Sequence, residues 1–277
     1  MGITISAHEL AQEIRRGGKN TILASFWLPG EGAGHTKYNS EHIPTSLFCD
    51  PATSLSSVPS SRQGRNPLPD ADTLQRAFEE WGLDVNHNVI VYDGGKGLFA
   101  ARAWWILTWA GIENVRILDG GMAAWEAAGY DVVGGPGNLH GHCTRRPNPG
   151  QLPVADIDDV KSGKYLLLDT REANRYAGKK EHLDLKAGHI PGAVNVPTRE
   201  LFNEDNTYRS PEELKKIFRD AGVDDPSKVI VYSGSGIHSA VAIAAMHQAG
   251  LEGAAVYIGG WSQWCANPKN PVERGTE

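Results

Sequence analysis

The residues with the clearest chemical potential form a glycine-rich turn at 233–238, Ser-Gly-Ser-Gly-Ile-His. The turn follows an apolar run, VIVY at 229–232, and precedes an apolar stretch of helical length. Small residues there let several backbone N–H groups point to one place, and a helix N-terminus adds partial positive charge. The pattern predicts a loop that holds an anion, and a tight turn without a ligand is the alternative. It lacks the Gly-Lys-Ser/Thr of a P-loop and the spacing of GxGxxG.

A second group of reactive residues, His140, His142 and Cys143, lies within 134–153, GGPGNLHGHCTRRPNPGQLP. This segment is rich in Gly and Pro and has no apolar period, which predicts a linker. A metal site needs a closed set of ligands on ordered backbone, and no further His or Cys pair lies nearby in the sequence. We therefore interpret these residues as incidental polar side chains of a connector and expect no metal site.

An internal repeat shows which elements position the turn. Matching blocks recur in one order: TILASFW at 21–27 and LLLDTRE at 166–172, His-Ile-Pro at 42–44 and 189–191, the apolar run with its glycine-rich turn at 89–111 and 229–250, and the blocks at 115–125 and 254–264. Such ordered self-similarity indicates two copies of one unit of about 120 residues. We expect domains at 1–133 and 154–277, joined by a linker at 134–153.

Each copy alternates short β-type runs with helical stretches, which is typical of an α/β unit with a parallel sheet. In the second copy we expect strands near 165–169, 194–196, 229–232 and 254–258 and helices near 155–161, 211–221, 236–249 and 260–265. Ser210-Pro211-Glu212-Glu213 has the features of a helix start, with a Ser cap, Pro in the first turn and early acids.

The composition limits the class of protein. The chain has 277 residues and a net charge of −6, which argues for two domains and against general binding to nucleic acid or an anionic membrane. The apolar runs are too short to span a bilayer, and Glu and Arg interrupt the first residues where a signal peptide needs an apolar stretch. Three scattered cysteines exclude a disulfide scaffold. We expect a soluble, cytoplasmic protein.

Four motifs in one order resemble the C-terminal domain of the two-domain rhodanese and 3-mercaptopyruvate sulfurtransferase family: LLLDTRE, GHIPGAVNVP, VIVYSGSGIHSA and YIGGWSQW. The first copy resembles the N-terminal, non-catalytic domain of that family, so the resemblance covers nearly the whole chain. It implies an α/β fold with two tandem rhodanese-like domains, each a mainly parallel sheet flanked by helices. It implies no metal, nucleotide or organic cofactor.

The resemblance also implies a chemistry for the turn. In this family, position 233 is a cysteine that accepts a sulfane sulfur and becomes a persulfide. The donor is a small anion, 3-mercaptopyruvate or thiosulfate, and the acceptor is a thiol or cyanide. The substrate-binding loop then consists of Gly234, Ser235, Gly236, Ile237 and His238.

Ser233 departs from the family at the most important position. A serine hydroxyl stays protonated without an adjacent base, and its oxygen does not carry a transferable sulfur as a thiolate does. We therefore expect the chain as written to be inactive in sulfur transfer, with Ser233 either engineered or natural. The alternative function is a non-catalytic protein that binds an anion or a persulfide partner. A phosphatase is excluded because the loop lacks a nucleophilic cysteine and a closing arginine.

Arg175 matches the family arginine that binds the anionic group of the substrate, a role suited to a guanidinium because it offers two parallel donors. We expect it to be the only strong positive charge at the loop. The mercaptopyruvate enzymes carry a second arginine where this chain has Asp184, and Lys179 or Lys180 is a potential replacement. The donor therefore stays open between thiosulfate and 3-mercaptopyruvate.

Further positions differ between the copies and from the family. Asp93 stands in the first copy where Ser233 stands in the second, so we expect only the second copy to bind an anion. An acid and a histidine that assist the cysteine in the mercaptopyruvate branch align with Ala52 and Asn66. We interpret Arg171 and His189 as structural, with Arg171 paired to a carboxylate.

Overall fold

The computed structural model describes residues 2–138 and 141–275. Contacts divide the chain into two compact units: a first unit of Met1–Ser57, Pro69–Gln151 and Glu204–Thr207, and a second of Val58–Leu68, Leu152–Asn203 and Tyr208–Glu277. The boundaries expected from the sequence differ from this division in three places: the expected linker falls within the first unit up to residue 151, residues 204–207 group with the first unit, and residues 58–68 group with the second. That segment precedes much of the first unit in the chain, yet its contacts are with the second unit.

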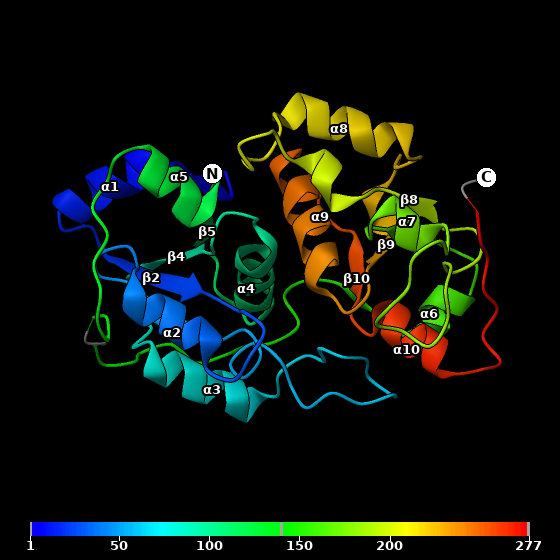
Figure 1. Ribbon diagram of the computed structural model, residues 1–277, viewed down its shortest axis with the longest axis horizontal. Coiled ribbons are helices and arrows are strands. Elements are labelled where there is room, and N and C mark those ends of the chain that lie inside the picture. Colours follow the sequence, from blue (N-terminus) through cyan, green and yellow to red (C-terminus); the bar gives the residue numbers. More distant parts are fainter. Residues whose placement is uncertain (1, 139–140, 276–277) are drawn as a thin grey trace. The chain divides into compact units, whose positions relative to one another are not determined.

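The first unit contains a five-stranded sheet in which every strand pairing is parallel, with the order β1-β5-β4-β2-β3. Its strands are β1 (Thr4–Ile5), β2 (Asn20–Ser25), β3 (Leu47–Cys49), β4 (Asn88–Tyr92) and β5 (Val115–Leu118). Its helices are α1 (Ala7–Arg15), α2 (Ala33–Ser40), α3 (Ala71–Glu80), α4 (Leu98–Trp109) and α5 (Gly121–Ala127) (Figure 1).

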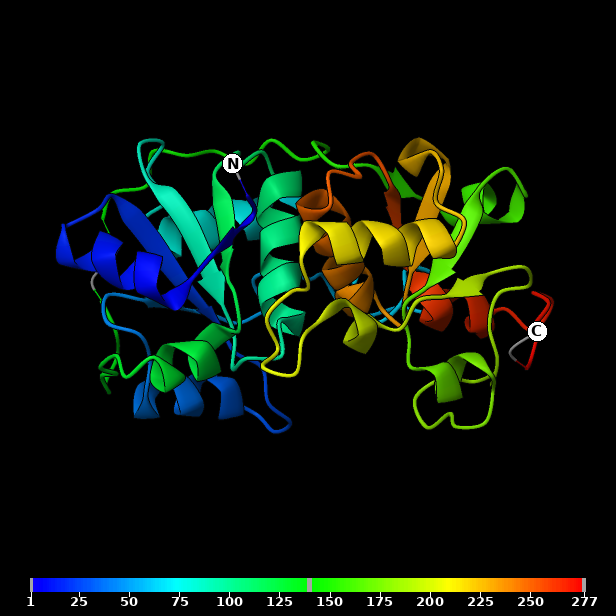
Figure 2. The same cartoon turned by 90° about the horizontal axis from the view of Figure 1, so that it is seen from above.

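Alternate residues of the central strand face opposite layers of the first unit. Ile90 and Tyr92 pack in one buried cluster with residues of α1, α2 and α5. Val89 and Val91, also buried, point to the other face, where α4 contacts β4 and β5. Figure 2 shows α4 on the side of the sheet away from α1. This two-faced burial is typical of a parallel α/β sheet.

The second unit repeats this topology, with strand order β6-β10-β9-β7-β8 and only parallel pairings in its sheet. Its strands are β6 (Val154–Ala155), β7 (Leu166–Asp169), β8 (Val194–Asn195), β9 (Val229–Tyr232) and β10 (Ala255–Tyr257). Its helices are α6 (Ile157–Lys161), α7 (Ala173–Tyr176), α8 (Pro211–Asp220), α9 (Ile237–Gln248) and α10 (Gly260–Ala266), with short 3-10 helices η1 (Thr198–Leu201) and η2 (Pro226–Lys228). Figure 1 shows α8 and α9 on one side of this sheet and α6, α7 and α10 on the other.

The fold class expected from the sequence is confirmed, and so are the eight elements expected in the second copy. The cap at Ser210 has the expected form, because its hydroxyl accepts from the Glu213 N–H while Pro211 opens α8. The strand β6, the helix α7 and the two 3-10 helices were not predicted. They span only two to four residues, too short for an apolar period to be recognised.

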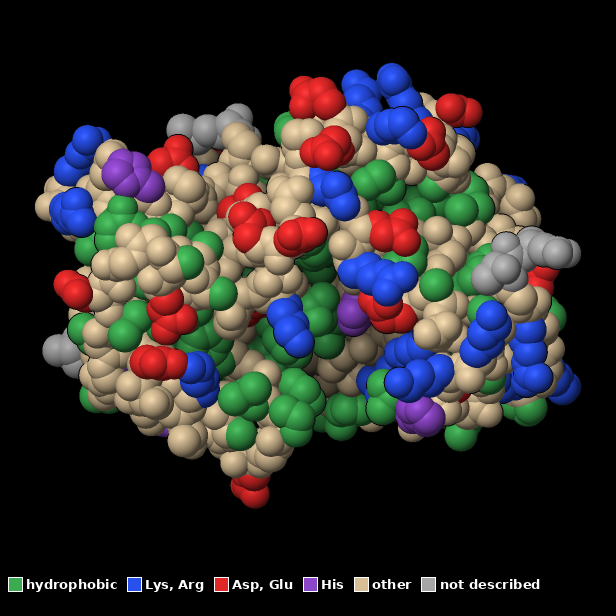
Figure 3. All heavy atoms as spheres, turned by 45° about the horizontal axis from the view of Figure 1, so that its top comes forward, with side chains coloured by type: hydrophobic (Ala, Val, Ile, Leu, Met, Phe, Trp, Pro, Cys, Tyr) green, Lys and Arg blue, Asp and Glu red, His purple; other side chains and the backbone are tan. Residues whose placement is uncertain are grey.

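Two surface properties bear on the class of protein. None of the helices in the described part of the chain combines the length and apolar character needed to cross a membrane. On the face shown in Figure 3, acidic and basic side chains alternate over most of the surface, and several basic side chains lie together toward its right-hand end.

Candidate anion-binding site

The glycine-rich turn lies at the carboxyl end of the central strand β9, the usual position for ligand sites in open α/β sheets. Ser233 follows the strand directly and is only 1% exposed. Its Oγ accepts from the Gly236 N–H at 3.0 Å. Gly236 has φ +83° and caps α9, a conformation that favours glycine. Ser233 therefore lies buried at the base of a short turn that connects the end of β9 to the start of α9.

The start of helix α10 packs against the turn and hydrogen-bonds to it. The Trp261 N–H donates to the Ser233 carbonyl at 2.8 Å. A Cβ on Gly260 would lie 2.4 Å from that carbonyl oxygen, so only glycine permits this approach. The first unit repeats this device, because the Met122 N–H donates to the Asp93 carbonyl at 2.8 Å and Gly121 makes the same close approach. The two turns are thus built on the same backbone frame.

The two turns differ in what fills them. In the first unit, Asp93 is 3% exposed and its carboxylate fills the turn. One oxygen accepts from the N–H groups of Gly95 at 2.8 Å and Gly97 at 3.1 Å, and the other accepts from Phe99 at 3.0 Å and Ala100 at 3.3 Å. The chain therefore supplies its own anion to this turn, as the position of Asp93 predicted.

In the second unit, Ser233 offers a single neutral oxygen in place of a carboxylate. Among the described residues, no acceptor is present for the N–H groups of Ser235, Ile237 and His238. These donors lie at the start of the twelve-residue helix α9, where negative charge is favoured. The turn thus has the backbone donors of an anion site without an internal anion.

Two arginines lie against this turn. A Cβ built on Gly234 would lie 3.5 Å from Nη1 of Arg175 and 3.0 Å from Nη2 of Arg65. Arg175 was expected here, but the expectation that it is the only strong positive charge is wrong. Arg65 belongs to the segment 58–68 and was missed, although the alignment of its neighbour Asn66 with a residue that assists the cysteine was a signal that this segment lies at the turn.

Asp184 and Glu181 fix the arginines. Nη2 of Arg175 donates to carboxylate oxygens of Glu181 and Asp184, each at 2.9 Å, and Nη1 of Arg65 donates to the other oxygen of Asp184. Lys179 and Lys180 are exposed, and within the described residues their side chains form no hydrogen bond or ion pair. Asp184, which stands where the mercaptopyruvate enzymes carry a second arginine, therefore binds the guanidinium groups of Arg65 and Arg175.

Arg171 has the structural role expected of it. It is 1% exposed, and its guanidinium donates to both oxygens of Asp169 at 2.6–3.1 Å and to the Gly188 carbonyl at 2.7 Å. The guanidinium also lies over the Trp261 ring, 4.6 Å from its centroid. Asp169 ends β7 and Arg171 follows two residues later, so the ion pair lies within one strand-to-helix loop, and the bond to Gly188 ties this loop to the segment before β8.

The aligned positions Ala52 and Asn66 do not reproduce an acid and a histidine. Nδ2 of Asn66 donates to the Ser235 Oγ at 2.8 Å, so the side chain still contacts the turn. An amide does not titrate in the physiological range, so Asn66 cannot take or give a proton as a histidine would. Ala52 has no polar side chain. Proton transfer by these two positions is therefore absent from the chemistry available here.

His189 and His238 differ in their contacts. His189 is 1% exposed, donates from Nδ1 to the Tyr176 carbonyl at 2.9 Å, and stacks on the Tyr176 ring. His238 lies at the turn, with Nδ1 2.9 Å from the Thr198 Oγ1. Burial, and then the Arg175 charge, lower the pKa of His238 to about 4. At neutral pH, its ring therefore adds no positive charge to the turn.

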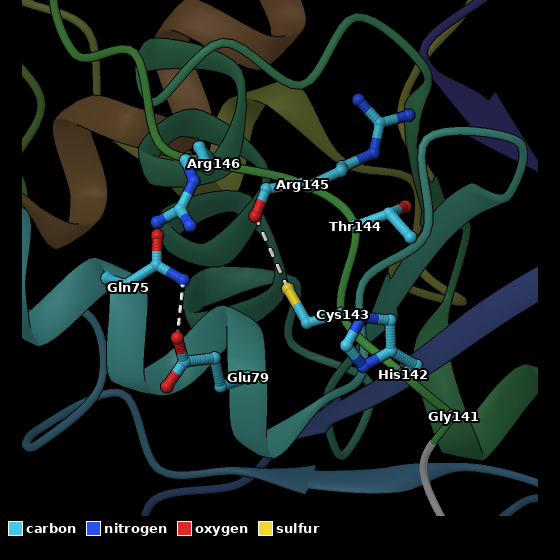
Figure 4. Close-up of a pocket in the computed structure, with 8 residues that line it drawn as sticks. All are labelled: Gln75, Glu79, Gly141, His142, Cys143, Thr144, Arg145 and Arg146. Carbon is cyan, nitrogen blue, oxygen red and sulfur yellow. Dashed lines mark hydrogen bonds between the residues drawn. The ribbon is translucent and has the colours of Figure 1, made fainter.

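A separate cavity of about 430 Å³ lies in the first unit, where Gln75 and Glu79 of α3 face residues 141–146 (Figure 4). The Cys143 thiol at this cavity donates to the Arg145 carbonyl at 3.3 Å. His140 lies outside the described residues. In the part of the chain that is described, no group of three His, Cys, Asp or Glu side chains is arranged to hold a metal ion.

Comparisons with known proteins agree with the repeat and with the fold. The sequence model of the rhodanese-like domain matches residues 31–128 and 157–267. The chain is 38% identical to the "Putative thiosulfate sulfurtransferase SseB" of Mycobacterium tuberculosis, over 99% of this chain and 98% of that protein. It is 34% identical to the 3-mercaptopyruvate sulfurtransferase of Escherichia coli, over 97% of each chain. The crystal structure of SseA from Escherichia coli, a 3-mercaptopyruvate sulfotransferase with the rhodanese fold, superposes with a TM-score of 0.81 and 30% identity, covering 95% of this chain and all of that one.

Proposed function

The chain belongs to the family of two-domain rhodanese-like sulfurtransferases, and we propose that it binds small anionic sulfur donors at residues 233–238. We further propose that it transfers their sulfur only when residue 233 is cysteine. Ser233 is the proposed catalytic position, and Arg175 with Gly234, Ser235, Gly236, Ile237 and His238 forms the proposed substrate-binding set.

One observation carries this proposal: the carboxylate that fills the first turn has no counterpart in the second. Four backbone N–H groups converge on Asp93 in the first unit. The corresponding turn at Ser233 has the same frame, two arginines beside it, and no internal anion among its described residues. An external anion would meet the same kind of donors that the Asp93 carboxylate meets.

The chemistry of sulfur transfer explains why the identity of residue 233 decides activity. A thiolate at this position would attack the outer sulfur of thiosulfate, and the S–S bond of thiosulfate would break as sulfite leaves with the electron pair. From 3-mercaptopyruvate, the C–S bond would break and the pyruvate enolate would take up a proton. Either route leaves a persulfide, whose outer sulfur a thiol or cyanide then removes.

Ser233 cannot start this sequence. Its hydroxyl is protonated, and the described hydrogen-bond partners of its Oγ are the Gly236 N–H and the Ser239 hydroxyl at 3.4 Å, neither of which is a base. Backbone N–H groups and a helix N-terminus lower the pKa of a nearby thiol. Because the pKa of a free thiol is about 8.5, such a shift forms thiolate at neutral pH, whereas an alcohol stays protonated. A cytoplasmic location, and the absence of nucleic-acid and membrane partners, belong to the same proposal.

The test compares the chain as written with Ser233→Cys and with a control, Ser227→Cys, which adds a thiol at an exposed site. Sulfur transfer to cyanide and to a thiol is measured with both donors. We expect transfer by Ser233→Cys with at least one donor, and background rates for the other two proteins. Background rates for Ser233→Cys with both donors would favour the alternative, a non-catalytic protein that binds an anion or a persulfide partner.

Binding is tested separately on the chain as written, by following backbone amide shifts during titration with sulfate, thiosulfate or 3-mercaptopyruvate. We expect saturable shifts at residues 233–238. Shifts at residues 93–97 with none at 233–238 would show that the wrong copy has been assigned.

A further inference from the structure

We propose that Arg65 is a second ligand-binding guanidinium of this site and gives it a preference for doubly charged anions. This inference rests on the proposed function, because it concerns the ligand bound at residues 233–238. It adds a specificity-determining residue from a segment that the sequence places in the other repeat.

Residues 58–68 are held on the second unit by contacts on both sides of Arg65. The Arg65 N–H donates to the Ser262 Oγ at 3.2 Å, and the Asn66 side chain donates to the Ser235 Oγ at 2.8 Å. Gly64 has φ +86°, and a Cβ there would lie 2.6 Å from the Gly259 carbonyl oxygen. Only glycine permits this approach, so the backbone of the segment sits directly on the loop before α10.

The guanidinium groups of Arg65 and Arg175 are oriented by one carboxylate. Each oxygen of Asp184, whose side chain is only 3% exposed, accepts from a different arginine. This arrangement uses Nη1 of Arg65 and Nη2 of Arg175. Because both bonds are made to one buried group, Asp184 holds the two guanidinium groups close to each other before any ligand arrives.

The remaining donors point to the turn. Nη2 of Arg65 and Nη1 of Arg175 are the atoms nearest to a Cβ built on Gly234, at 3.0 and 3.5 Å. Within the described residues, neither nitrogen has a hydrogen-bond acceptor. The arginine side chains are 35% and 22% exposed, so a small anion can reach them. Two unsatisfied charged donors therefore flank the backbone donors of residues 235–238.

The charge of the ligand decides how much Arg65 contributes. Coulomb attraction scales with the product of the charges, so a second guanidinium favours a dianion, such as thiosulfate or sulfate, over a singly charged carboxylate. A dianion with several oxygens also has enough acceptors for both arginines at once. The alternative is that Arg65 only docks its segment through Asp184 and does not contact the ligand.

The test uses the full chain with Ser233 and measures Kd for thiosulfate and for 3-mercaptopyruvate by amide shifts. Arg65→Met keeps the aliphatic stem and removes the donors, and Arg62→Met is the control on the same segment. For Arg65→Met, we expect about tenfold weaker thiosulfate binding and about threefold weaker 3-mercaptopyruvate binding, as for the loss of one charged hydrogen bond at a partly exposed site. Arg62→Met is expected to change neither Kd by more than about twofold.

The outcomes separate this inference from the proposed function. If the unchanged protein binds thiosulfate at residues 233–238 but Arg65→Met matches Arg62→Met, the role of Arg65 is overturned and the proposed function stands. Equal losses for both ligands would overturn the preference for dianions. If the unchanged protein binds neither ligand there, both proposals fail.

A second variant keeps the test valid if Arg65→Met releases the segment. Arg65→Lys retains the charge and is expected to keep part of the preference for thiosulfate, while losing affinity because an ammonium cannot reproduce the fork. A docking role alone would instead shift the Gly64 and Asn66 amides in Arg65→Lys without changing the ratio of the two Kd values.

Discussion

Replacing Asp93 with Asn tests the central argument that these turns are built to hold negative charge. The Asp93 carboxylate is buried and accepts four backbone N–H groups, two on each oxygen. Asparagine has the same shape, but it replaces one oxygen with an NH₂ group. Two backbone donors then face a donor, and the remaining oxygen loses its negative charge.

The expected cost follows from this count. Hydrogen bonds to a charged group contribute about 1.5–3 kcal/mol each, so losing two of them predicts a decrease of about 3–5 kcal/mol in the free energy of unfolding. The expected cost is set below the sum of two hydrogen bonds at their upper value, because the longest of the four contacts, to the Ala100 N–H, is 3.3 Å. The loss belongs to the first unit, because each of these donors and Asp93 itself lie in it.

The assay is urea denaturation of the full chain, followed by tryptophan fluorescence and by circular dichroism. Asp72→Asn is the matched control, because Asp72 is an exposed acid in the first turn of α3. Its removal is expected to cost less than about 1 kcal/mol, the range of a helix-dipole interaction. If Asp93→Asn costs no more than Asp72→Asn, the first turn does not favour an anion, and its frame gives no reason to expect anion binding at the Ser233 turn.

Two further predictions concern side chains beside the Ser233 turn. In the Ser233→Cys background, Arg175→Ala is expected to weaken transition-state binding by about 2–3 kcal/mol, measured as a lower kcat/KM. Arg175→Lys is expected to recover only part of this loss. An unchanged kcat/KM for both donors would remove Arg175 from the site. Because burial lowers the pKa of folded His238 from 6.5 to about 4, the unfolded chain takes up this proton first as the pH falls. The free energy of unfolding is therefore expected to decrease between pH 7 and pH 5, and about 2 kcal/mol of this decrease should be absent in His238→Gln. An equal pH dependence of the unchanged chain and His238→Gln in urea denaturation would contradict this.

The class of fold and the position of the turn were predictable because both depend on residues that are close together in the sequence. The apolar run at 229–232 is long enough to identify a buried strand, and the small residues after it identify a sharp turn into a helix. The repeat then gave two such turns, and the exchange of Asp93 for Ser233 distinguished them. The cap at Ser210 was predictable for the same reason, since a cap is formed by residues three positions apart.

The surroundings of the turn depended on contacts between distant parts of the chain. Arg65 meets Asp184 across 119 positions, and Asn66 meets Ser235 across 169. No periodicity or spacing encodes such contacts, because they arise when whole elements pack and bring their loops together. The sequence by itself determined two α/β repeats and one turn with room for an anion. The tertiary structure decided that a segment of the first repeat lies on the second, so that one buried carboxylate orients two guanidinium groups toward the turn.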